Sequence, residues 1–345
     1  MKKITALILT AAITLSMTAC GQSGSASPKN ENVQSGTAEF PKSGKIATFF
    51  IGGSVGAGGD LNMRTLIRYL EPKMGITIVP QNVTGSRTIY NAVKNMEKEP
   101  ADGYTYAYLL YPHCIAELFN PATKDNMYAI DDYYPLCNLV TDSALIAVRA
   151  DDPRFENVND LKALVEYMKE SGDKLLISAC SIGGDDDITV HKIMMAVPEI
   201  ADQLTIVNGD AVSDAITSLL GGTLDIFTGN VGDVGTLVED GDFKVLSVFA
   251  PERSQFLPDV PTALESGYDI INSTSRGVVL HKDTPEDIRK KMQEYIESAV
   301  NDPEFLGDME SQGFEVDYKN PEEYKEWLQN EYNQFSEIAK SYGWQ

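Results

Sequence analysis

Apolar residues recur with two alternating periods along most of the chain. Short runs rich in β-branched and aromatic residues are typical of buried strands, and longer segments with apolar residues every three or four positions are typical of helices. The predicted strands are Lys45–Ile51, Ile76–Gln81, Tyr104–Leu110, Ala144–Arg149, Leu175–Ser178, Leu204–Val207, Leu224–Phe227, Lys244–Phe249 and Gly277–His281. The first predicted helices are Leu61–Lys73 and Ser86–Glu97. This alternation predicts an α/β fold with parallel sheets covered by helices, and ligands at the carboxyl ends of strands.

Three amphipathic helices are predicted near the end of the chain, over Pro285–Asn301, Pro303–Gly313 and Pro321–Tyr342. Each has a proline in its first turn, where a missing N–H costs no helical hydrogen bond. The residues just before these prolines are Thr284, Asp302 and Asn320. Their side-chain oxygens predict that all three act as N-caps.

The first twenty residues have the pattern of a bacterial lipoprotein signal. Two lysines precede an apolar run from Ile4 to Leu15, and Met17-Thr18-Ala19 leads to Cys20. The run is too short, and too interrupted by Thr and Ser, for a membrane-spanning helix. The resemblance to a lipobox predicts that residues 1–19 are removed and that Cys20 carries a diacylglyceryl group, which anchors the protein to the outer face of the cell membrane. An ordinary cleaved signal with a chance cysteine is the alternative.

Residues 20–44 are rich in Ser, Gly, Asn and Gln, and we predict that they form a flexible linker behind the anchor. The remaining residues, 45–345, are enough for one large or two medium α/β domains with a hydrophobic core.

The chain is strongly acidic. It carries 28 Lys and Arg against 51 Asp and Glu, a formal net charge of −23. Loss of the signal removes two lysines and no acid, so the mature chain would be more negative still. Such a protein is not expected to bind nucleic acid or anionic lipid. An anionic ligand would need local donors, namely backbone N–H groups and helix N-termini.

Cysteine and histidine show no metal-site pattern. Apart from Cys20, the cysteines Cys114, Cys137 and Cys180 form no CxxC pair, and the three histidines lack HExxH spacing. We therefore expect neither a metal site nor a cofactor. Two of these cysteines could form a disulfide outside the cytoplasm, and three buried free thiols fit the sequence at least as well.

A glycine-rich turn, residues 52–60, follows the first predicted strand and would let the backbone approach a ligand closely. It lacks the third glycine of GxGxxG and the Lys-Ser/Thr of a P-loop, which argues against dinucleotides and triphosphates. Residues 52–56 do satisfy GxSxG, the nucleophile elbow of α/β-hydrolases, with Asp225 and His281 in the expected order. Against a hydrolase, Gly56–Gly59 separate the serine from its helix. A structural turn without a ligand is a further alternative.

Several segments resemble one family, the extracytoplasmic solute receptors of tripartite tricarboxylate transporters, also called Bug receptors. The similarity begins with the glycine turn, which ends in Gly-Gly-x-Asp, and with Arg64 one turn into the helix. It continues through Gln81–Gly85, Pro100–Thr105, Gly221–Asp225, Arg253, Pro258–Tyr268 and Arg276-Gly277. Each segment is weak alone, but their order and spacing over residues 45–340 make the resemblance specific.

The resemblance implies an α/β protein with a two-lobed, periplasmic-binding-protein-like (type II) fold. Each lobe would be a mainly parallel sheet flanked by helices, with the ligand cleft between the lobes. Residues 45–141 and 262–345 would form lobe 1, and residues 142–261 would form lobe 2. The implied partners are a small organic acid, that is a mono-, di- or tricarboxylate, and the large and small integral-membrane subunits of a transporter.

The resemblance also implies that one loop from each lobe grips a carboxylate through backbone amides and bound waters. The first loop supplies the candidate ligand-binding residues Gly53, Ser54, Val55, Gly56, Ala57 and Asp60. The second loop, Ser178–Asp187, supplies the candidates Ser181, Gly183, Gly184, Asp185 and Asp186. Both loops lead into helix N-termini, where free N–H groups and the helix dipole favour an anion.

Two features depart from the family pattern. The acidic run Asp185–Asp187 is explained by helix N-capping, or by an Asp that orders water or meets a cationic group on the ligand. Arg87 could bind a distal carboxylate of the ligand, or lie solvated on the first turn of its helix.

Further candidates follow the ends of predicted strands. Tyr111 and His113 come just after one strand, and Thr228 and Asn230 follow another, so all four are expected near the ligand edge of a sheet. The alternating rings of Tyr104, Tyr106 and Tyr108 are more typical of a core than of a pocket. His191, on an apolar helical face, is interpreted as a core residue.

These features predict a lipid-anchored solute-binding protein that captures a small organic carboxylate outside the cell for a tripartite-type secondary transporter, and that catalyses no reaction. Three alternatives stay open: a ligand-sensing subunit for a membrane kinase, a lipid-anchored serine hydrolase using Ser54, and a receptor of another transporter class.

Overall fold

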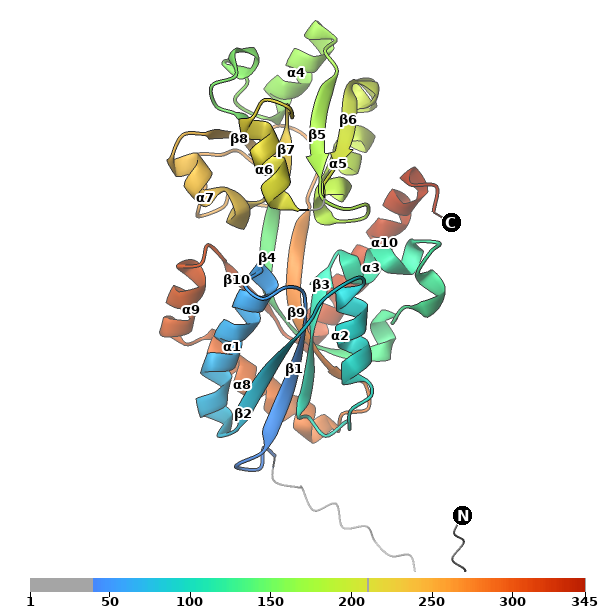
Figure 1. The fold of residues 1–345 in the computed structure, drawn as a ribbon, viewed down its shortest axis with the longest axis vertical. Helices are drawn as coiled ribbons and strands as arrows, with labels where there is room; N and C mark the ends of the chain where they lie inside the picture. The colour runs from blue at the N-terminus through green and yellow to red at the C-terminus, as the bar shows by residue number, and fades with distance from the viewer. Residues whose placement is uncertain (1–39, 210, 345) are drawn as a thin grey trace, which may run out of the picture. The chain divides into compact units, whose positions relative to one another are not determined.

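The computed structural model describes residues 40–209 and 211–344 (Figure 1). The predicted signal, Cys20 and the linker up to residue 39 lie outside the described residues. Within the predicted linker, Phe40 packs on Tyr104 with ring centroids 5.1 Å apart. The described residues belong to one compact unit, Glu39–Gln345.

The main sheet is mixed. Its strands run in the order β10 (Val316–Lys319), β4 (Tyr133–Arg149), β9 (Ser273–His281), β3 (Thr105–Tyr111), β1 (Ile46–Gly52) and β2 (Thr77–Val83). The far end of β4 pairs with β7 (Phe227–Asn230) and β8 (Phe243–Val248), and a separate pair contains β5 (Leu175–Ala179) and β6 (Leu204–Asn208). The pairs β1–β2, β1–β3 and β5–β6 are parallel. All pairings of β4 and β9 are antiparallel. The α/β class is therefore confirmed, with more antiparallel pairing than the alternation predicts.

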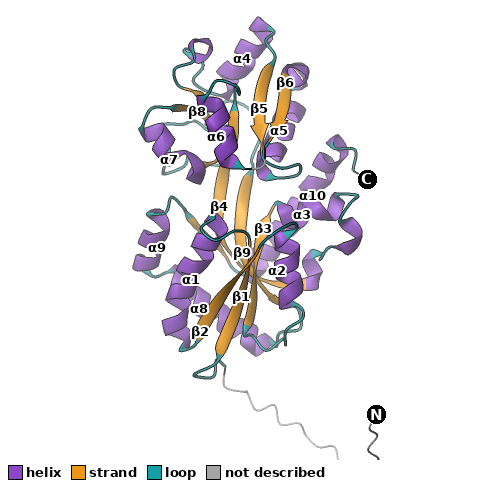
Figure 2. Cartoon of the chain, viewed as in Figure 1, coloured by secondary structure: helices purple, strands orange, loops and turns teal. Residues whose placement is uncertain are grey.

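Helices flank the strands (Figure 2). They are α1 (Gly58–Met74), α2 (Thr88–Met96), α3 (His113–Phe119), α4 (Leu161–Ser171), α5 (Asp185–Ala196), α6 (Val212–Leu220), α7 (Val231–Glu239), α8 (Glu286–Val300), α9 (Pro303–Glu310) and α10 (Pro321–Ser341). Short 3-10 turns lie at Lys124–Asn126, Ile130–Asp132, Pro153–Phe155 and Pro198–Gln203.

The predicted N-caps are confirmed for two of the three C-terminal helices. Asp302 accepts a hydrogen bond from the N–H of Glu304, and Asn320 accepts one from the N–H of Glu323. The prediction for Thr284 is wrong, because Pro285 occupies the N-cap position of α8 and no side chain caps that end. Buried Thr284 instead donates its backbone N–H to the carbonyl of His281.

Strand β4 contributes residues to two sets of buried side chains. The larger cluster, here called the first core, contains Tyr133, Leu136 and Val140 of β4 and draws on segments 47–140 and 278–339, together with Ile188 of α5. Two further clusters, here together called the second core, contain Ala144–Val148 of the same strand and draw on segments 144–270. In Figure 1, β4 and β9 run between the elements around these cores.

Cys114, Cys137 and Cys180 are free thiols. Burial raises the pKa of Cys137 to about 12, so this thiol stays protonated at neutral pH. Of the two interpretations that the sequence left open, the structure has the free thiols rather than a disulfide.

Candidate functional site

The first glycine turn leaves β1 and enters α1. Its Gly53 has φ 138° and Gly56 has φ 84°, conformations that favour glycine. The N–H of Gly53 donates to the carbonyl of Val83 at 2.9 Å, which fixes the turn against the end of β2. Ser54, Val55, Gly56 and Ala57 are exposed. These four residues, predicted from the sequence to bind the ligand, therefore lie on an accessible turn of the structure.

Asp60 holds this turn from beneath. It is buried, its Oδ2 accepts the N–H of Gly56 at 2.8 Å, and its Oδ1 accepts Arg64 Nε at 2.8 Å and Asn82 Nδ2 at 2.9 Å. Burial raises the pKa of the Asp60 carboxyl, but these hydrogen bonds together outweigh it, so its pKa is lowered. Predicted as a ligand-binding residue, Asp60 instead faces inward and braces the loop.

The second turn repeats this geometry between β5 and α5. Gly183 has φ 76° and donates its N–H to Asp187 Oδ2 at 2.8 Å. The N–H of Gly184 donates to the carbonyl of Ser181 at 2.9 Å, as the N–H of Ala57 does to Ser54 at 3.2 Å. Ser181 and the neighbouring Ile182 are exposed.

The two turns also match in sequence. Ser54-Val55-Gly56-Ala57 and Ser181-Ile182-Gly183-Gly184 are followed, at the same spacing, by Asp60 and Asp187. Each turn thus presents the N-terminus of its helix with a glycine amide fixed by a buried carboxylate.

The acidic run at the start of α5 is not an N-cap, because Gly184 occupies that position without a side-chain hydrogen bond. Asp187 braces Gly183, as described. Burial first, and the charge of Asp185 next, raise the pKa of Asp186 well above its ordinary value. Asp185 Oδ2 is buried without a hydrogen-bond partner among the described residues.

Tyr108 and Arg276 lie against the N-terminus of α1. A Cβ on Gly59 would lie 2.7 Å from the Tyr108 ring, and a Cβ on Gly58 would lie 3.4 Å from Arg276 Nη2. Burial is the main cause that raises the pKa of Tyr108 to about 12, and Asp185, at the start of α5, adds a smaller effect. Tyr108 and Arg276 therefore lie next to the first turn.

Arg276 forms an ion pair with Asp142 on the neighbouring strand β4. Its Nη1 and Nη2 both lie 3.3 Å from Asp142 Oδ2, and its guanidinium stacks 4.8 Å from the Phe314 ring centroid. Burial opposes the charge of Arg276, but nearby carboxylates, Asp142 first, outweigh it and raise the pKa of Arg276. Burial raises the pKa of Asp142 despite this partner. Arg276 is thus a permanently charged donor beside the first turn.

The other sequence candidates have varied positions. Tyr111, Thr228 and Asn230, predicted as ligand-binding residues, are buried and hydrogen-bonded within the protein. Tyr111 donates its hydroxyl to Glu331 at 2.5 Å and packs edge-on against Trp327. Thr228 exchanges hydrogen bonds with Ser178 inside the second core. Asn230 caps α7 and donates Nδ2 to the carbonyl of Asp142. Each of these three side chains therefore has a hydrogen-bond partner elsewhere in the protein.

Arg87 is held at the edge of the site. Its Nε donates to Glu117 at 3.0 Å, and its guanidinium stacks 4.1 Å from the Tyr90 ring centroid. With Ser181, Gly183, His113 and others it lines a pocket of about 220 Å³. Because Arg87 is paired with Glu117, it is not simply solvated. A ligand carboxylate would have to share the Arg87 guanidinium with Glu117.

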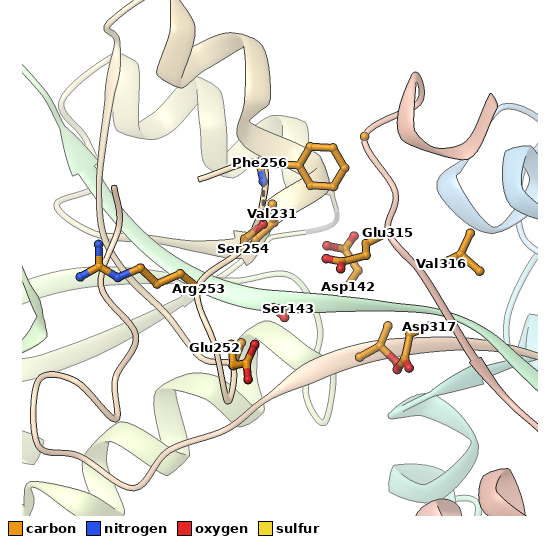
Figure 3. Close-up of a pocket in the computed structure, with 13 residues that line it drawn as sticks. Asp142, Ser143, Val231, Glu252, Arg253, Ser254, Phe256, Glu315, Val316 and Asp317 are labelled. Atoms are coloured by element: carbon orange, nitrogen blue, oxygen red, sulfur yellow. Dashed lines mark hydrogen bonds between the residues drawn. The ribbon is translucent and has the colours of Figure 1, made fainter. Parts of the chain in front are cut away.

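A second pocket, of about 270 Å³, lies against β4 and contains none of the predicted site residues (Figure 3). Its charged lining residues are Asp142, Glu252, Arg253, Glu315 and Asp317. Four carboxylates against one guanidinium make this pocket a poor site for an anion.

The hydrolase pattern is not assembled into a triad. Asp225 Oδ1 accepts Arg154 Nη2 at 2.6 Å, and His281 Nε2 lies 3.3 Å from Glu97. Ser54 is exposed on the first turn. Each residue of the GxSxG hypothesis therefore has a different environment.

Residues 40–209 and 211–344 contain no group of three or more His, Cys, Asp or Glu side chains that could hold a metal ion. No helix of this part of the chain is long and apolar enough to cross a membrane.

Sequence analysis missed the roles of Arg276, Tyr108 and Asp187. Arg276 was part of the recognised pattern, and its position directly before the predicted strand Gly277–His281 was the available signal. Tyr108 was assigned to the core, where its ring indeed lies. Of the three aspartates in the acidic run, only Asp187 has the same spacing from the serine of its turn as Asp60 has. A comparison of the two turn sequences would have revealed this match.

Two glycine turns, each at a helix N-terminus and each carried by its own strand–helix unit, define a solute-binding protein. A family model described as "Tripartite tricarboxylate transporter family receptor" matches residues 63–344, and the chain belongs to this family.

Among its relatives, protein BugT of Bordetella pertussis is 21% identical over 289 residues, which is 84% of this chain and 86% of BugT. A TctC solute-binding protein from Polaromonas has a similar fold, with a TM-score of 0.74, 19% identity, and 88% of this chain and 100% of that chain covered. MatC from Rhodopseudomonas palustris, solved with bound malate, has a TM-score of 0.69, 20% identity, and coverage of 87% and 100%.

Proposed function

We propose that this protein is a lipid-anchored extracytoplasmic receptor that binds a small organic carboxylate and delivers it to a tripartite tricarboxylate-type transporter. The observation that carries the proposal is the pair of matching turns, in which Gly56 and Gly183 are each fixed by a buried carboxylate at a helix N-terminus. Helix N-termini bind anions through free N–H groups and the helix dipole. Family membership and the malate bound by MatC support the same ligand class.

Local donors would overcome the acidic composition of the chain. Arg276 supplies a fixed positive charge next to Gly58. Burial, and next the charge of Asp185, raise the pKa of Asp186, which favours its uncharged form at the start of α5. Surface carboxylates elsewhere are screened beyond roughly 8–10 Å at physiological ionic strength. The carboxylate grip therefore depends on the two turns and Arg276 rather than on net charge.

The proposed architecture has residues 45–141 and 262–345 as lobe 1 and residues 142–261 as lobe 2. Most residues of the two sets of buried side chains follow this division, whereas Ile188 belongs to the first core and Ala263 and Ile270 belong to the second. The connecting strands β4 and β9 would bend when the lobes close on the ligand. Closure would create the surface that the large and small membrane subunits bind.

A thermal-shift and calorimetric screen tests the ligand class. Malate comes first, followed by other mono-, di- and tricarboxylates, with the matching methyl esters as controls. A ligand at 100 times its Kd stabilises the folded state by about 2.7 kcal/mol. We expect stabilisation by an acid and its loss when one carboxylate is esterified. Stabilisation by uncharged or cationic compounds alone contradicts the proposal, and hydrolysis of the esters supports the Ser54 alternative.

Membrane anchoring is tested separately with a Cys20→Ser variant. We expect the wild-type chain in the membrane fraction and the variant released, as two or three acyl chains are needed for stable anchoring. An unchanged distribution contradicts lipidation of Cys20.

A further inference from the structure

The last turn of α10 reaches the second glycine turn. Tyr342, just after α10, donates its hydroxyl to Asp187 Oδ2 at 2.5 Å, and this oxygen also accepts the N–H of Gly183. Trp344 stacks on Tyr342 with ring centroids 4.7 Å apart. A Cβ on Gly183 would lie 3.2 Å from the Trp344 ring. The tail therefore contacts both the glycine of the turn and the carboxylate that fixes it.

A further contact ties the same turn of α10 to α5. Ser341 Oγ lies 3.0 Å from His191 Nδ1, and the His191 and Tyr342 rings are 4.3 Å apart. Elsewhere along their length, α5 and α10 do not fill the space between them, where Lys192, Met195, Glu331 and others line a groove of about 730 Å³. The contact between the two helices is thus concentrated at the end that carries the second turn.

Asp60 and Asp187, the carboxylates that fix the two turns, have hydrogen-bond partners from different parts of the fold. Asp60 is held by Arg64 and Asn82, which belong to α1 and β2 around the first core, as does the first turn itself. Asp187 follows β5, a strand of the second core, but its hydroxyl partner comes from α10. The buried residues of that helix, including Tyr324, Leu328 and Phe335, belong to the first core. Ile188, next to Asp187, is itself buried in the first core, so the second turn lies where the two cores meet and is braced from the side of the first core.

We propose that Tyr342 and Trp344 form a clasp that positions the second turn for the ligand and couples its geometry to the approach of the two lobes. While the clasp is closed, the Tyr342 hydroxyl and the Gly183 amide share Asp187, and Trp344 restricts the backbone at Gly183. Separation of α10 from α5 would remove both restraints and leave the first turn unchanged. The role in ligand binding depends on the proposed function, whereas the positioning of the turn does not.

Amide hydrogen exchange in the unliganded full chain tests the clasp, because Gly183 and Gly56 donate to Asp Oδ2 over the same distance. In Tyr342→Phe, which keeps the ring, we expect exchange of the Gly183 amide to be about tenfold faster, the effect of one hydrogen bond to a charged group. The Gly56 amide should be unchanged. Tyr332→Phe, on the same helix, is the matched control, since its hydroxyl has no hydrogen bond within the described residues. Equal exchange at Gly183 in both variants overturns the clasp.

Calorimetry with malate separates the two proposals. We expect Tyr342→Phe and Trp344→Leu to weaken malate binding about tenfold while Tyr332→Phe binds as the wild type. Wild-type affinity in both clasp variants overturns the positioning role. If the wild-type chain binds neither malate nor another carboxylate, the proposed function fails, and the exchange experiment still decides on the clasp.

Discussion

Asp60 and Asp187 occupy equivalent positions in the two halves of the candidate site. Each is buried in the first turn of its helix, and each accepts the N–H of a glycine four residues earlier at 2.8 Å. The glycines have φ angles of 84° and 76°. The same local geometry therefore appears twice in one chain, on two separate strand–helix units.

Loss of the first brace should loosen the first turn. Asp60→Ala removes the acceptor of Gly56, Arg64 and Asn82, and we expect the free energy of unfolding to fall by about 1–3 kcal/mol. Urea denaturation measures this change. Ser54→Ala, on the exposed face of the same turn, should leave stability within 0.5 kcal/mol, roughly the usual range for surface changes. Equal stability of the two variants would show that Asp60 is not a brace.

The two turn glycines should respond differently to a methyl group. Gly56→Ala should cost about 1–2 kcal/mol, because the positive φ disfavours an L side chain and no atom lies within 4 Å of the new Cβ. Gly183→Ala should cost more, since its Cβ would also meet Ala116 and Trp344 at 3.2 Å. Gly235→Ala, in the body of α7 with no atom within 4 Å, should instead stabilise by about 0.4–1 kcal/mol. A larger loss at Gly56 than at Gly183 would contradict the packing described here.

Asp186 should make stability depend on pH. Its folded pKa is raised by burial and by Asp185, so the folded state binds a proton more tightly than the unfolded state. The cost is absent below the unfolded pKa, about 4, and is complete once the pH exceeds the folded pKa. Asp186→Asn should therefore gain stability relative to wild type as the pH rises from about 4 to 8. Denaturation curves across this range measure the difference, and a constant difference would refute a raised pKa.

Arg276 should matter through its geometry as well as its charge. Arg276→Lys keeps the positive charge beside Asp142 but loses the planar fork and the stacking on Phe314. We expect carboxylate affinity to fall about tenfold, equal to 1.4 kcal/mol. Calorimetry with malate measures the change, with Arg253→Lys as the control on an exposed ion pair with Glu265. Equal losses in the two variants would remove Arg276 from the site.

The local patterns of the sequence predicted much of this fold. The helices α9 and α10 begin at the predicted prolines, because proline and the preceding Asp or Asn act within one turn. The glycine turns also lie where the spacing placed them. Strand β4 was predicted only from Ala144, although it begins at Tyr133. Its polar residues, among them Asn138 and Asp142, interrupt the apolar pattern but are buried, and they bond to Ser275 and Arg276 across the sheet.

The bounds of strand β7 could likewise not be predicted from the apolar pattern. The apolar run predicted a strand over Leu224–Phe227, whereas the strand is Phe227–Asn230, where the backbone pairs with β4. The contact of Tyr342 with Asp187 joins segments 155 positions apart, and no spacing rule connects them. The sequence alone could not predict which distant residues tertiary packing brings into contact. It therefore could not predict which candidate site residues face inward.

The continuity of β4 has a consequence for the order of folding. Its first half pairs with β9 and its second half with β7 and β8, all of which follow it far along the chain. During synthesis the first half of the strand must wait for its β9 partner until residues 273–281 have left the ribosome, which exposes an apolar edge that invites aggregation. The first core cannot complete its sheet without β9, so residues 45–141 expressed alone should fold poorly. Contacts of such long range also predict slow, cooperative refolding.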